Sequence, residues 1–495
     1  MSKINTVAII GGGVSGLSAG GLLAQKGLKV KLFEANDKLG GSCANTNLGG
    51  YTFHDGALYL AFPGVLEHVF ETLGLDRSSL LPLRKITANQ TTTLPDGTVV
   101  TFGNGRDVTI KGSNVETRNA QLQRELIHML KKWESVFRLF ADDILLHPFS
   151  LSRMLAKGWR QLPKLHGSVA SEIKDLFSDE AVRAAMSGVT LFAGKPPQKM
   201  PVQSLLGLVA MLTEGFYLPD GGMGKIPEAL SRALNNNDGE IFLNSKVNKI
   251  FVKNGRIQGL EVDGQGLVEA DAVISTVSDM LTFGSLLDQG YVPNGMRRKA
   301  RNAPLSHKAF VVQLGLSNRV DVPSHSNSIL PKMEDQYQVF LPSKGEVKWP
   351  IYSVPTITVP ELAPQGGSII EMFPSIEQDL PANDWDDQKS ERIVESAVNT
   401  LTHLHKIDIA VKRVLSPKDF QDKMHLYKGV AYGLSPTADL SAQFPHATPI
   451  DGLFQAGQTT FPGYGVSSAA MSGILTAEIL IRTMKRNLLW HNEVL

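Results

Sequence analysis

Residues 11–16 read Gly-Gly-Gly-Val-Ser-Gly and fit the pattern G-x-G-x-x-G. The apolar run 7–10 before them predicts a strand buried on both faces of a sheet. Residues 14–26 after them have helical spacing, and Gly27 stands where a helix cap belongs. Residues 29–34 largely alternate and end on an acid, as a second strand would. The first 34 residues therefore predict a β-α-β unit with a glycine-rich turn.

The glycines of this turn have distinct physical roles. Gly11 allows a tight turn, Gly13 lets the backbone approach a pyrophosphate, and Gly16 lets the helix pack close to the strand. The free N–H groups at the helix N-terminus favour the anion. Glu34 lies at the end of the second strand, where a carboxylate accepts hydrogen bonds from a ribose diol. The unit therefore predicts a dinucleotide site; the alternative is a glycine-rich turn in an unrelated α/β domain.

Two further glycine-containing segments suit the same cofactor. Residues 39–42 follow Glu34 closely, and paired glycines there can pass the chain near the pyrophosphate. Residues 452–458 predict a strand that ends in glycine and a polar residue, and residues 461–466 open the last helix. The predicted cofactor contacts of these segments are Gly40, Gly41, Ser42, Gly457, Gln458, Gly465 and Val466. Each segment alone could be a structural turn.

The 495 residues exceed what one hydrophobic core usually holds, so we expect two domains or three. The stretch 115–216 is mostly helical in pattern. Further strands are predicted at 240–251, 256–262, 270–275, 305–315 and 368–373, and further helices at 390–403 and 465–484. No segment is convincing as a membrane-spanning helix, because the uncharged runs are interrupted by glycine and proline.

Five segments spread along the chain carry a family resemblance. They are residues 53–56 (Phe-His-Asp-Gly), 218–224 (Leu-Pro-Asp-Gly-Gly-Met-Gly), 413–417 (Arg-Val-Leu-Ser-Pro), 432–434 (Tyr-Gly-Leu) and 461–466 (Phe-Pro-Gly-Tyr-Gly-Val). With the N-terminal turn, they resemble the FAD-dependent carotenoid desaturase family, which includes phytoene desaturases, carotenoid cis–trans isomerases and retinol saturases. The segment 460–463 is more similar to the isomerase and saturase branch, whereas many relatives have Arg at Ser42 and that branch often has an acid at Gln458.

The resemblance implies an α/β fold, with a Rossmann-type FAD-binding domain and an inserted mixed α+β substrate domain. The FAD-binding domain would comprise residues 1–105, 218–285 and 425–495, and the substrate domain 106–217 and 286–424. FAD is the implied cofactor, and the backbone of Val247 is implied to contact its adenine side. The apolar substrate would lie in a tunnel between the domains.

The same resemblance implies an oxidoreductase acting on an apolar polyene or isoprenoid. Desaturation, saturation and cis–trans isomerisation through the flavin all remain open. One alternative is another flavin oxidase such as an amine oxidase. Amine oxidation would require an aromatic cage near the flavin, and only the last helix region offers a candidate, Tyr464. Another is a non-catalytic isoprenoid-binding protein of the same fold.

Composition excludes several other classes. The 49 basic and 48 acidic residues give a net charge of +1, which argues against a nucleic-acid-binding protein. The single cysteine, Cys43, excludes an intramolecular disulfide and predicts a reducing, cytoplasmic location. It could be a flavin attachment point, but a small residue packed near the cofactor is the simpler interpretation. His403 and His405 have no further ligand close in sequence, so no metal site is predicted.

Catalytic residues are not identified by the pattern. His54 and Asp55 could be acid–base groups near the flavin, or they could hold a turn through side-chain hydrogen bonds. Residues 144–171 contain four cations, no carboxylate and interleaved apolar residues. This pattern suits an amphipathic segment in a membrane interface or a solvated basic face, and the resemblance favours peripheral membrane contact. The oligomeric state stays open.

Overall fold

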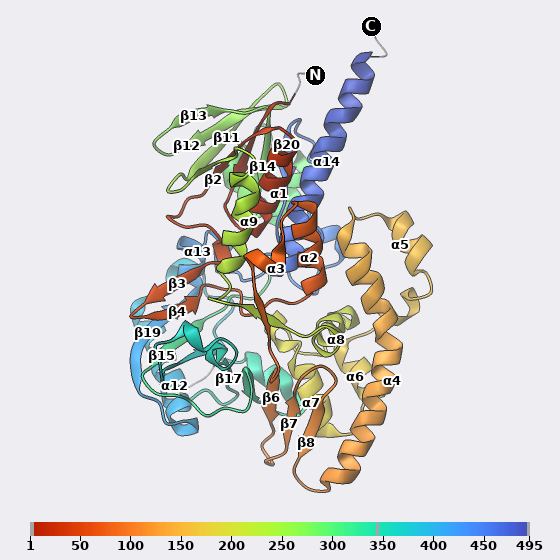
Figure 1. The fold of residues 1–495 in the computed structure, drawn as a ribbon, viewed down its shortest axis with the longest axis vertical. Coiled ribbons are helices and arrows are strands. Elements are labelled where there is room, and N and C mark those ends of the chain that lie inside the picture. The colour runs from red at the N-terminus through yellow and green to blue at the C-terminus, as the bar shows by residue number, and fades with distance from the viewer. Residues whose placement is uncertain (1–3, 343–345, 493–495) are drawn as a thin grey trace.

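The computed structural model describes residues 4–342 and 346–492. It is elongated, with a parallel sheet in the upper half of Figure 1 and a larger, mostly antiparallel sheet in the lower half. The α/β class predicted for the chain is confirmed, and each sheet carries helices of its own.

The upper sheet has five parallel strands in the order β10-β2-β1-β14-β20. Their bounds are β1 Thr6–Ile10, β2 Lys29–Phe33, β10 Glu240–Phe242, β14 Ala272–Ser275 and β20 Leu453–Gln455. Val7 and Ile9 of β1 are buried in one hydrophobic core, and Ala8 and Ile10 are buried in another on the opposite face. A continuous apolar run is therefore what a strand covered on both faces requires.

Three helices cover one face of this sheet: α1 (Val14–Gln25), α9 (Lys225–Asn235) and α14 (Val466–Asn492). The helices approach closely at glycines; a Cβ on Gly473 would lie 2.1 Å from the carbonyl oxygen of Ser15. The other face is covered by an antiparallel sheet of β11 (Val247–Lys253), β12 (Arg256–Val262) and β13 (Gly266–Glu269).

The lower sheet has eight strands in the order β19-β15-β18-β17-β16-β6-β7-β8. Their bounds are β6 Gln90–Thr93, β7 Val99–Phe102, β8 Val108–Lys111, β15 Val311–Leu316, β16 Ser326–Ile329, β17 Ile351–Ser353, β18 Ser368–Met372 and β19 Ile409–Leu415. Two distant stretches of the chain join where β6 pairs parallel with β16. The predicted FAD-binding segment 1–105 ends between β7 and β8, which pair with each other in the lower sheet. The division of the chain into two domains stays a prediction.

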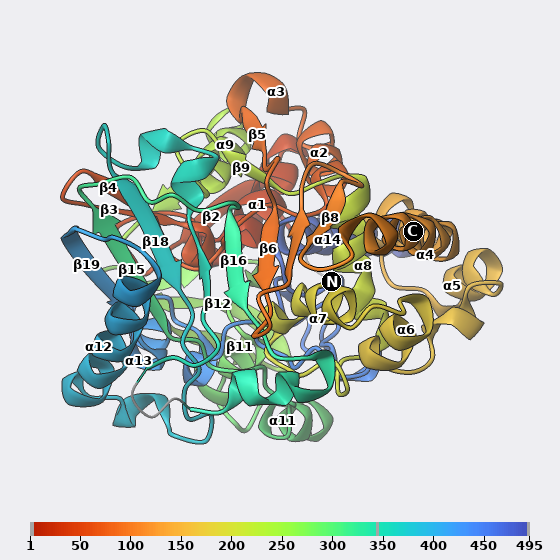
Figure 2. The same cartoon turned by 90° about the horizontal axis from the view of Figure 1, so that it is seen from below.

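Helices flank the lower sheet at both ends, as Figure 2 shows. One group is α4 Val115–Asp142, α5 Leu151–Gly158, α6 Val169–Leu176, α7 Glu180–Gly188 and α8 Leu205–Thr213. This group matches the helical pattern of residues 115–216. The other group is α12 Asp387–Leu404 and α13 Pro417–Asp422.

The remaining strands and helices lie outside the two large sheets. They are β3 Asn45–Leu48, β4 Tyr51–His54, β5 Leu83–Lys85, β9 Tyr217–Pro219, α2 Pro63–Thr72, α3 Arg77–Leu80, α10 Asp279–Leu281 and α11 Asn294–Arg301. Within the described residues, every helix is too short or too polar to cross a lipid bilayer.

Strands β6 and β16 of the lower sheet were not predicted from the sequence, because they bury polar side chains and lack apolar alternation. Thr91 of β6 lies 2.7 Å from the hydroxyl of Ser324, and Thr92 lies 3.1 Å from that of Ser328 on β16. These side chains satisfy one another across the strand pair, so a buried strand without apolar alternation is stable. Strand β15 also begins later than predicted, at Val311.

Candidate functional site

A cavity of about 960 Å³ begins at one edge of the parallel sheet. Gly11, Glu34, Thr276 and Gly457 follow directly or closely after β1, β2, β14 and β20, and all four line the cavity. Parallel strands bring their carboxyl ends to the same edge, and ligands of open α/β sheets bind in the crevice there. The strand order places β1 at the point where the chain switches direction across the sheet.

Eleven of the twelve predicted cofactor residues line this cavity. They are Gly11, Gly13, Glu34, Gly40, Gly41, Ser42, Val247, Gly457, Gln458, Gly465 and Val466. The other, Gly16, packs against the strand: a Cβ there would lie 2.1 Å from the carbonyl oxygen of Gly11. This is the close-packing role that its position in the pattern predicts. Direct contact of these residues with FAD stays a prediction.

The turn after β1 presents backbone to the cavity. Gly11 has a φ of +101°, which L side chains rarely adopt. A Cβ built on Gly13 would meet no atom within 4 Å, so the space beside this residue is open. Gly13 is the residue before α1, so no side chain of this N-cap residue bonds the N–H groups at the start of the helix. A backbone that is open at a helix N-terminus fits the pyrophosphate of a dinucleotide.

Glu34 is 5% exposed and braces the turn. Its Oε2 accepts a hydrogen bond from the backbone N–H of Gly12 at 2.7 Å, and its Oε1 accepts one from that of Asn36 at 2.9 Å. A carboxylate has about four lone-pair directions, so both oxygens can still accept a bond from a ribose hydroxyl. The residue type and its place at the cavity wall fit that role.

The paired glycines lie against the first turn. The N–H of Gly40 donates to the carbonyl oxygen of Gly12 at 2.9 Å. A Cβ on Gly41 would lie 3.7 Å from the Cα of Gly13. Both glycines have positive φ, +121° and +54°. The two glycine segments therefore form one continuous backbone surface on the cavity.

The C-terminal segments form the wall beyond this surface. Gly457 has a φ of +113°, and its N–H donates to the hydroxyl of Ser472 on α14 at 3.0 Å. Gly465 and Val466 line the cavity at the start of α14, which gives it a second helix N-terminus. Val247, the first residue of β11, lies at the wall beside Lys246.

Aromatic side chains line the part of the cavity between the two sheets. The rings of Tyr432 and Tyr464 have centroids 4.8 Å apart, and their planes differ by 30°. Tyr59 stacks on Phe216 at 4.3 Å, and His307 lies edge-on to Tyr432 at 5.4 Å. Sequence reasoning singled out Tyr464 alone; Tyr432 stood in the quoted motif 432–434 without a role, because nothing local shows that it faces residue 464.

These polar aromatic groups are neutral at physiological pH. Burial raises the pKa of Tyr59 to about 12 and also raises the pKa values of Tyr432 and Tyr464. Burial, with a smaller contribution from Lys195, lowers the pKa of His307 to about 4. This part of the cavity therefore combines aromatic surface with uncharged hydrogen-bonding groups, which suits a largely apolar ligand.

The candidate acid–base pair lies outside the cavity lining. The carboxylate of Asp55 is 2.7 Å from both the Lys38 ammonium and the Arg413 guanidinium. His54 is 2% exposed, and burial lowers the pKa of its ring, with Glu371 opposing the shift. Asp55 thus ties the β3–β4 hairpin to Arg413 of β19, whereas both ring nitrogens of His54 are without a hydrogen-bond partner among the described residues. The acid–base and the turn interpretation of this pair both stay predictions.

The surroundings of Cys43, His403 and His405 explain these residues without a flavin link or a metal ion. Burial, with a smaller contribution from Asp55, raises the pKa of the Cys43 thiol to about 12, so the group is not a thiolate. His403 pairs with Glu346 at 2.9 Å, and His405 bonds the hydroxyl of Tyr352 at 2.7 Å. Among the described residues, no group of three or more potential ligands could hold a metal ion.

Several known proteins of similar sequence are carotenoid desaturases. The chain is 25% identical over 497 residues to a zeta-carotene-forming phytoene desaturase of Myxococcus xanthus, covering 96% of this chain and 93% of that protein. It is 24% identical over 490 residues to a lycopene-forming phytoene desaturase of Pantoea ananas, covering 96% and 99%. The resemblance inferred from the motifs is confirmed.

Solved structures that share the fold include an oxidoreductase and a putrescine oxidase. An oxidoreductase from Methanosarcina mazei matches with a TM-score of 0.65 at 16% identity, covering 96% of this chain and all of that one. Putrescine oxidase bound to putrescine matches with a TM-score of 0.62 at 17% identity, covering 97% and 99%. The family model of flavin containing amine oxidoreductases matches residues 14–481. The chain therefore belongs to the flavin containing amine oxidoreductase family, and it is an FAD-dependent oxidoreductase.

Proposed function

We propose that the protein desaturates, saturates or isomerises a long apolar polyene or isoprenoid in the aromatic part of its cavity. The observation that carries this proposal is the continuity of the cavity: one space joins the glycine segments at the sheet edge to the rings of Tyr432 and Tyr464. The names of the desaturase relatives support the same substrate class.

The residues present fit FAD along its whole length. Val247 would lie at the adenine, Glu34 at the ribose, and Gly11, Gly13 and the α1 N-terminus at the pyrophosphate. Gly457 and Gly465 would lie beside the flavin end. FAD supplies the hydride acceptor for an adjacent C–H bond. The aromatic walls orient the chain, and their burial excludes water from the reacting carbons.

An expression experiment tests this function. The gene is introduced into a host that accumulates phytoene, and lipid extracts are separated and their absorption spectra recorded. We expect polyene products with a changed number or geometry of double bonds. A Gly13→Val variant, designed to lack FAD, controls for endogenous reactions. Unchanged extracts from cells that contain FAD-loaded protein would contradict the proposal.

Amine oxidation is a second candidate, favoured by one observation. Tyr432 and Tyr464 form a paired aromatic surface, which is the feature that amine oxidation would require near the flavin. Hydrogen peroxide release from a panel of primary amines distinguishes the two functions. Turnover of an amine that Tyr432→Leu abolishes would favour this candidate over the polyene reaction.

We also propose that the protein touches a membrane through the α5 patch, which comprises Phe149, Leu151, Leu155 and Trp159. These side chains are 42%, 58%, 47% and 59% exposed. Phe149 also packs on Phe461 at 5.6 Å, next to the segment that opens α14. An apolar substrate dissolved in lipid would therefore meet the protein close to the cavity.

The four cations near this patch are less available to a lipid surface than the sequence pattern indicates, because each has a partner within the protein. Asp143, one residue before the basic stretch, pairs with Arg153 at 2.9 Å and also with Lys157. Arg160 stacks over the ring of Trp159 at 5.2 Å, and Lys164 donates to a backbone carbonyl at 3.0 Å. Apolar contact, more than charge, would then hold the patch to lipid.

A further inference from the structure

The paired glycines lie in a short loop between β2 and β3, which we call the cofactor loop and which comprises residues 39–44. Gly40, Gly41 and Ser42 of this loop line the cavity. Glycine loses more conformational freedom on folding than any other residue, so two adjacent glycines keep one conformation only where surrounding contacts hold them. Side chains beside the cofactor loop provide such contacts.

The side chain of Lys38 joins the two ends of the cofactor loop. Its ammonium donates hydrogen bonds to the carbonyl oxygen of Asn45 at 2.6 Å, to the hydroxyl of Thr46 at 2.9 Å and to the carboxylate of Asp55 at 2.7 Å. An ammonium has three donors, so all of them are used within the protein. Because Lys38 precedes the loop and Asn45 follows it, the bond between them closes the loop at its base.

Asp55 ties this closed loop to the lower sheet. Its side chain is 6% exposed, and its other oxygen accepts hydrogen bonds from the hydroxyl of Thr46 and from the guanidinium of Arg413 on β19, both at 2.7 Å. Arg413 also donates to the side-chain oxygen of Gln313 on β15 at 2.6 Å. A continuous series of polar contacts thus runs from Lys38 to two strands of the lower sheet.

The backbone at Asp55 contacts the cofactor loop directly. The N–H of Asp55 donates to the carbonyl oxygen of Ala44 at 3.0 Å, and the N–H of Ala57 donates to that of Ser42 at 2.9 Å. Ala57 lines the same cavity as Ser42. The position of Asp55 therefore sets the position of the loop and of the cavity wall beside it.

We propose that Lys38 is a positioning residue for FAD, which holds the cofactor loop in its binding conformation before the cofactor arrives. The inference goes beyond the polyene function and rests on the predicted contact of the paired glycines with the pyrophosphate. Lys38, Asp55 and Arg413 all lie outside the cavity lining, so they act on FAD through the loop. Without the closing bonds, only a fraction of the molecules would hold the loop ready, and the apparent FAD affinity would fall by that fraction.

Binding of FAD to the full-length apoprotein of a Lys38→Met variant tests the proposal. Methionine keeps an unbranched side chain and removes the ammonium. We expect the Kd for FAD to rise about tenfold, the effect of losing hydrogen bonds to charged groups. The rise should come from slower association at an unchanged dissociation rate, whereas a lysine that touched FAD would mainly change dissociation.

Hydrogen exchange of the cofactor loop gives a second readout. The backbone amides of residues 39–44 should exchange faster in the apoprotein of Lys38→Met than in the wild-type apoprotein. Saturation with FAD should bring both proteins to the same slow exchange, because the bound cofactor then holds the loop. A purely structural role of Lys38 would instead raise exchange throughout the molecule and persist in the FAD complex.

Lys132→Met is the matched control. The Lys132 side chain is 34% exposed, against 42% for Lys38, and its ammonium lies 2.6 Å from the 11% exposed carboxylate of Glu172. Lys132 lies on α4, outside the cavity lining, so this variant should bind and release FAD at the wild-type rates. If Lys38→Met does not fold, Thr46→Val removes one acceptor of the Lys38 ammonium at nearly constant shape and should also slow FAD association.

The other outcomes overturn the inference in distinguishable ways. Wild-type association and exchange in Lys38→Met would show that the cofactor loop keeps its conformation without the lysine. Faster loop exchange at an unchanged FAD affinity would show that the loop does not receive the cofactor, which also contradicts the predicted contact of the paired glycines. Faster dissociation as the only change would make Lys38 a direct contact of FAD. The polyene function would stand in all three cases, because the lipid products of the wild type test it separately.

Discussion

Gly13 and Gly16 belong to one turn, but the space around each is different. A side chain on Gly13 would project into the open cavity, whereas one on Gly16 would strike the backbone of Gly11. The three-residue spacing of the pattern thus separates a position that faces the ligand from one that packs the helix on the strand. Substitutions at the two positions should therefore fail in different ways.

We expect Gly13→Val to fold normally and to purify without FAD, because its side chain occupies the space of the pyrophosphate. Gly16→Val should instead lose about 2–3 kcal/mol of unfolding free energy through overpacking. Flavin absorbance and thermal denaturation of the apoproteins measure the two effects. A Gly13→Val protein with a full complement of flavin would show that the turn does not hold the cofactor.

Glu34 is predicted to act through both carboxylate oxygens. One oxygen already accepts a hydrogen bond from the N–H of Gly12, and the other accepts one from the N–H of Asn36. A glutamine at this position would therefore place its NH₂ group against one of these backbone N–H groups in either orientation of its amide. Glu34→Gln should weaken FAD binding by about 1.5–3 kcal/mol, or roughly 10- to 100-fold. Titration of the apoprotein with FAD measures this change. Asp37→Asn, a nearby acid outside the cavity lining, is the control and should leave the affinity unaltered.

At the scale of elements, α5 differs from the other helices in what it exposes. Its large apolar side chains face outward at the edge of the molecule, beside the long helix α4 (Figure 1). Asp143 neutralises two of the nearby cations, which the pattern of residues 144–171 could not show because the partner lies just outside it. The membrane proposal therefore rests on the α5 patch.

Replacing Leu151, Leu155 and Trp159 with serine should reduce binding to neutral and anionic liposomes alike, by tenfold or more, since burying each side chain contributes about 1.5–3 kcal/mol. The pair Arg160→Gln and Lys164→Gln should reduce binding to anionic liposomes only, by about 1 kcal/mol for each charge. Co-sedimentation measures both. Leu267→Ser, at a 58% exposed leucine of β13, is the control. Equal sedimentation of the triple variant and the wild type would make the α5 patch an ordinary surface.

For the whole molecule, buried titrating groups make stability depend on pH. Burial lowers the pKa values of His307, His325 and His446 to about 4, 3 and 4. Each histidine therefore binds a proton more readily in the unfolded chain. Its contribution to the free energy of unfolding is fully present above pH 6.5 and is lost as the pH falls toward its folded pKa. Burial raises the pKa of Asp279 to about 7, so this carboxyl keeps a proton in the folded state and acts in the opposite direction.

Unfolding between pH 6.5 and 4.5 should therefore take up protons: His307, His325 and His446 contribute about three and Asp279 releases about one. His54, His405 and His425, whose pKa values burial also lowers, add to this uptake. The free energy of unfolding should fall steeply with acid over this range, at about 1.4 kcal/mol per proton and pH unit. Asp279→Asn should raise the uptake by about one proton and steepen the fall. Denaturant unfolding of the apoprotein at a series of pH values measures both slopes. Identical slopes in the variant and the wild type would show that Asp279 ionises normally.

The sequence by itself determined the parts of the protein that rest on local patterns. The β-α-β unit, the helical middle and the glycine positions follow from periodicity and from backbone geometry that few residues allow. Cavity-lining positions such as Gly11 and Glu34 could be named because a fixed spacing sets them at the ends of adjacent strands. The motifs also gave the family and with it the cofactor.

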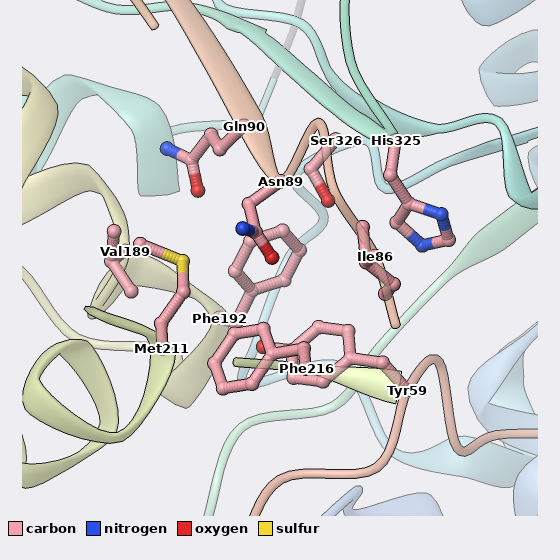
Figure 3. A pocket seen from close by; sticks show the side chains of 10 residues that line it. All are labelled: Tyr59, Ile86, Asn89, Gln90, Val189, Phe192, Met211, Phe216, His325 and Ser326. Atoms are coloured by element: carbon pink, nitrogen blue, oxygen red, sulfur yellow. The ribbon is translucent and has the colours of Figure 1, made fainter. Parts of the chain in front are cut away.

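Only the tertiary structure decided what distant segments do together. Tyr432 and Tyr464 meet because α14 and the segment before it return to the cavity, and the polar strand β6 is stable because β16, far along the chain, satisfies its hydroxyls. Asn89 and His325, more than two hundred residues apart in the sequence, likewise line one small pocket (Figure 3). Such contacts depend on long-range packing, and side chains that bond only across it leave no periodic trace in the sequence.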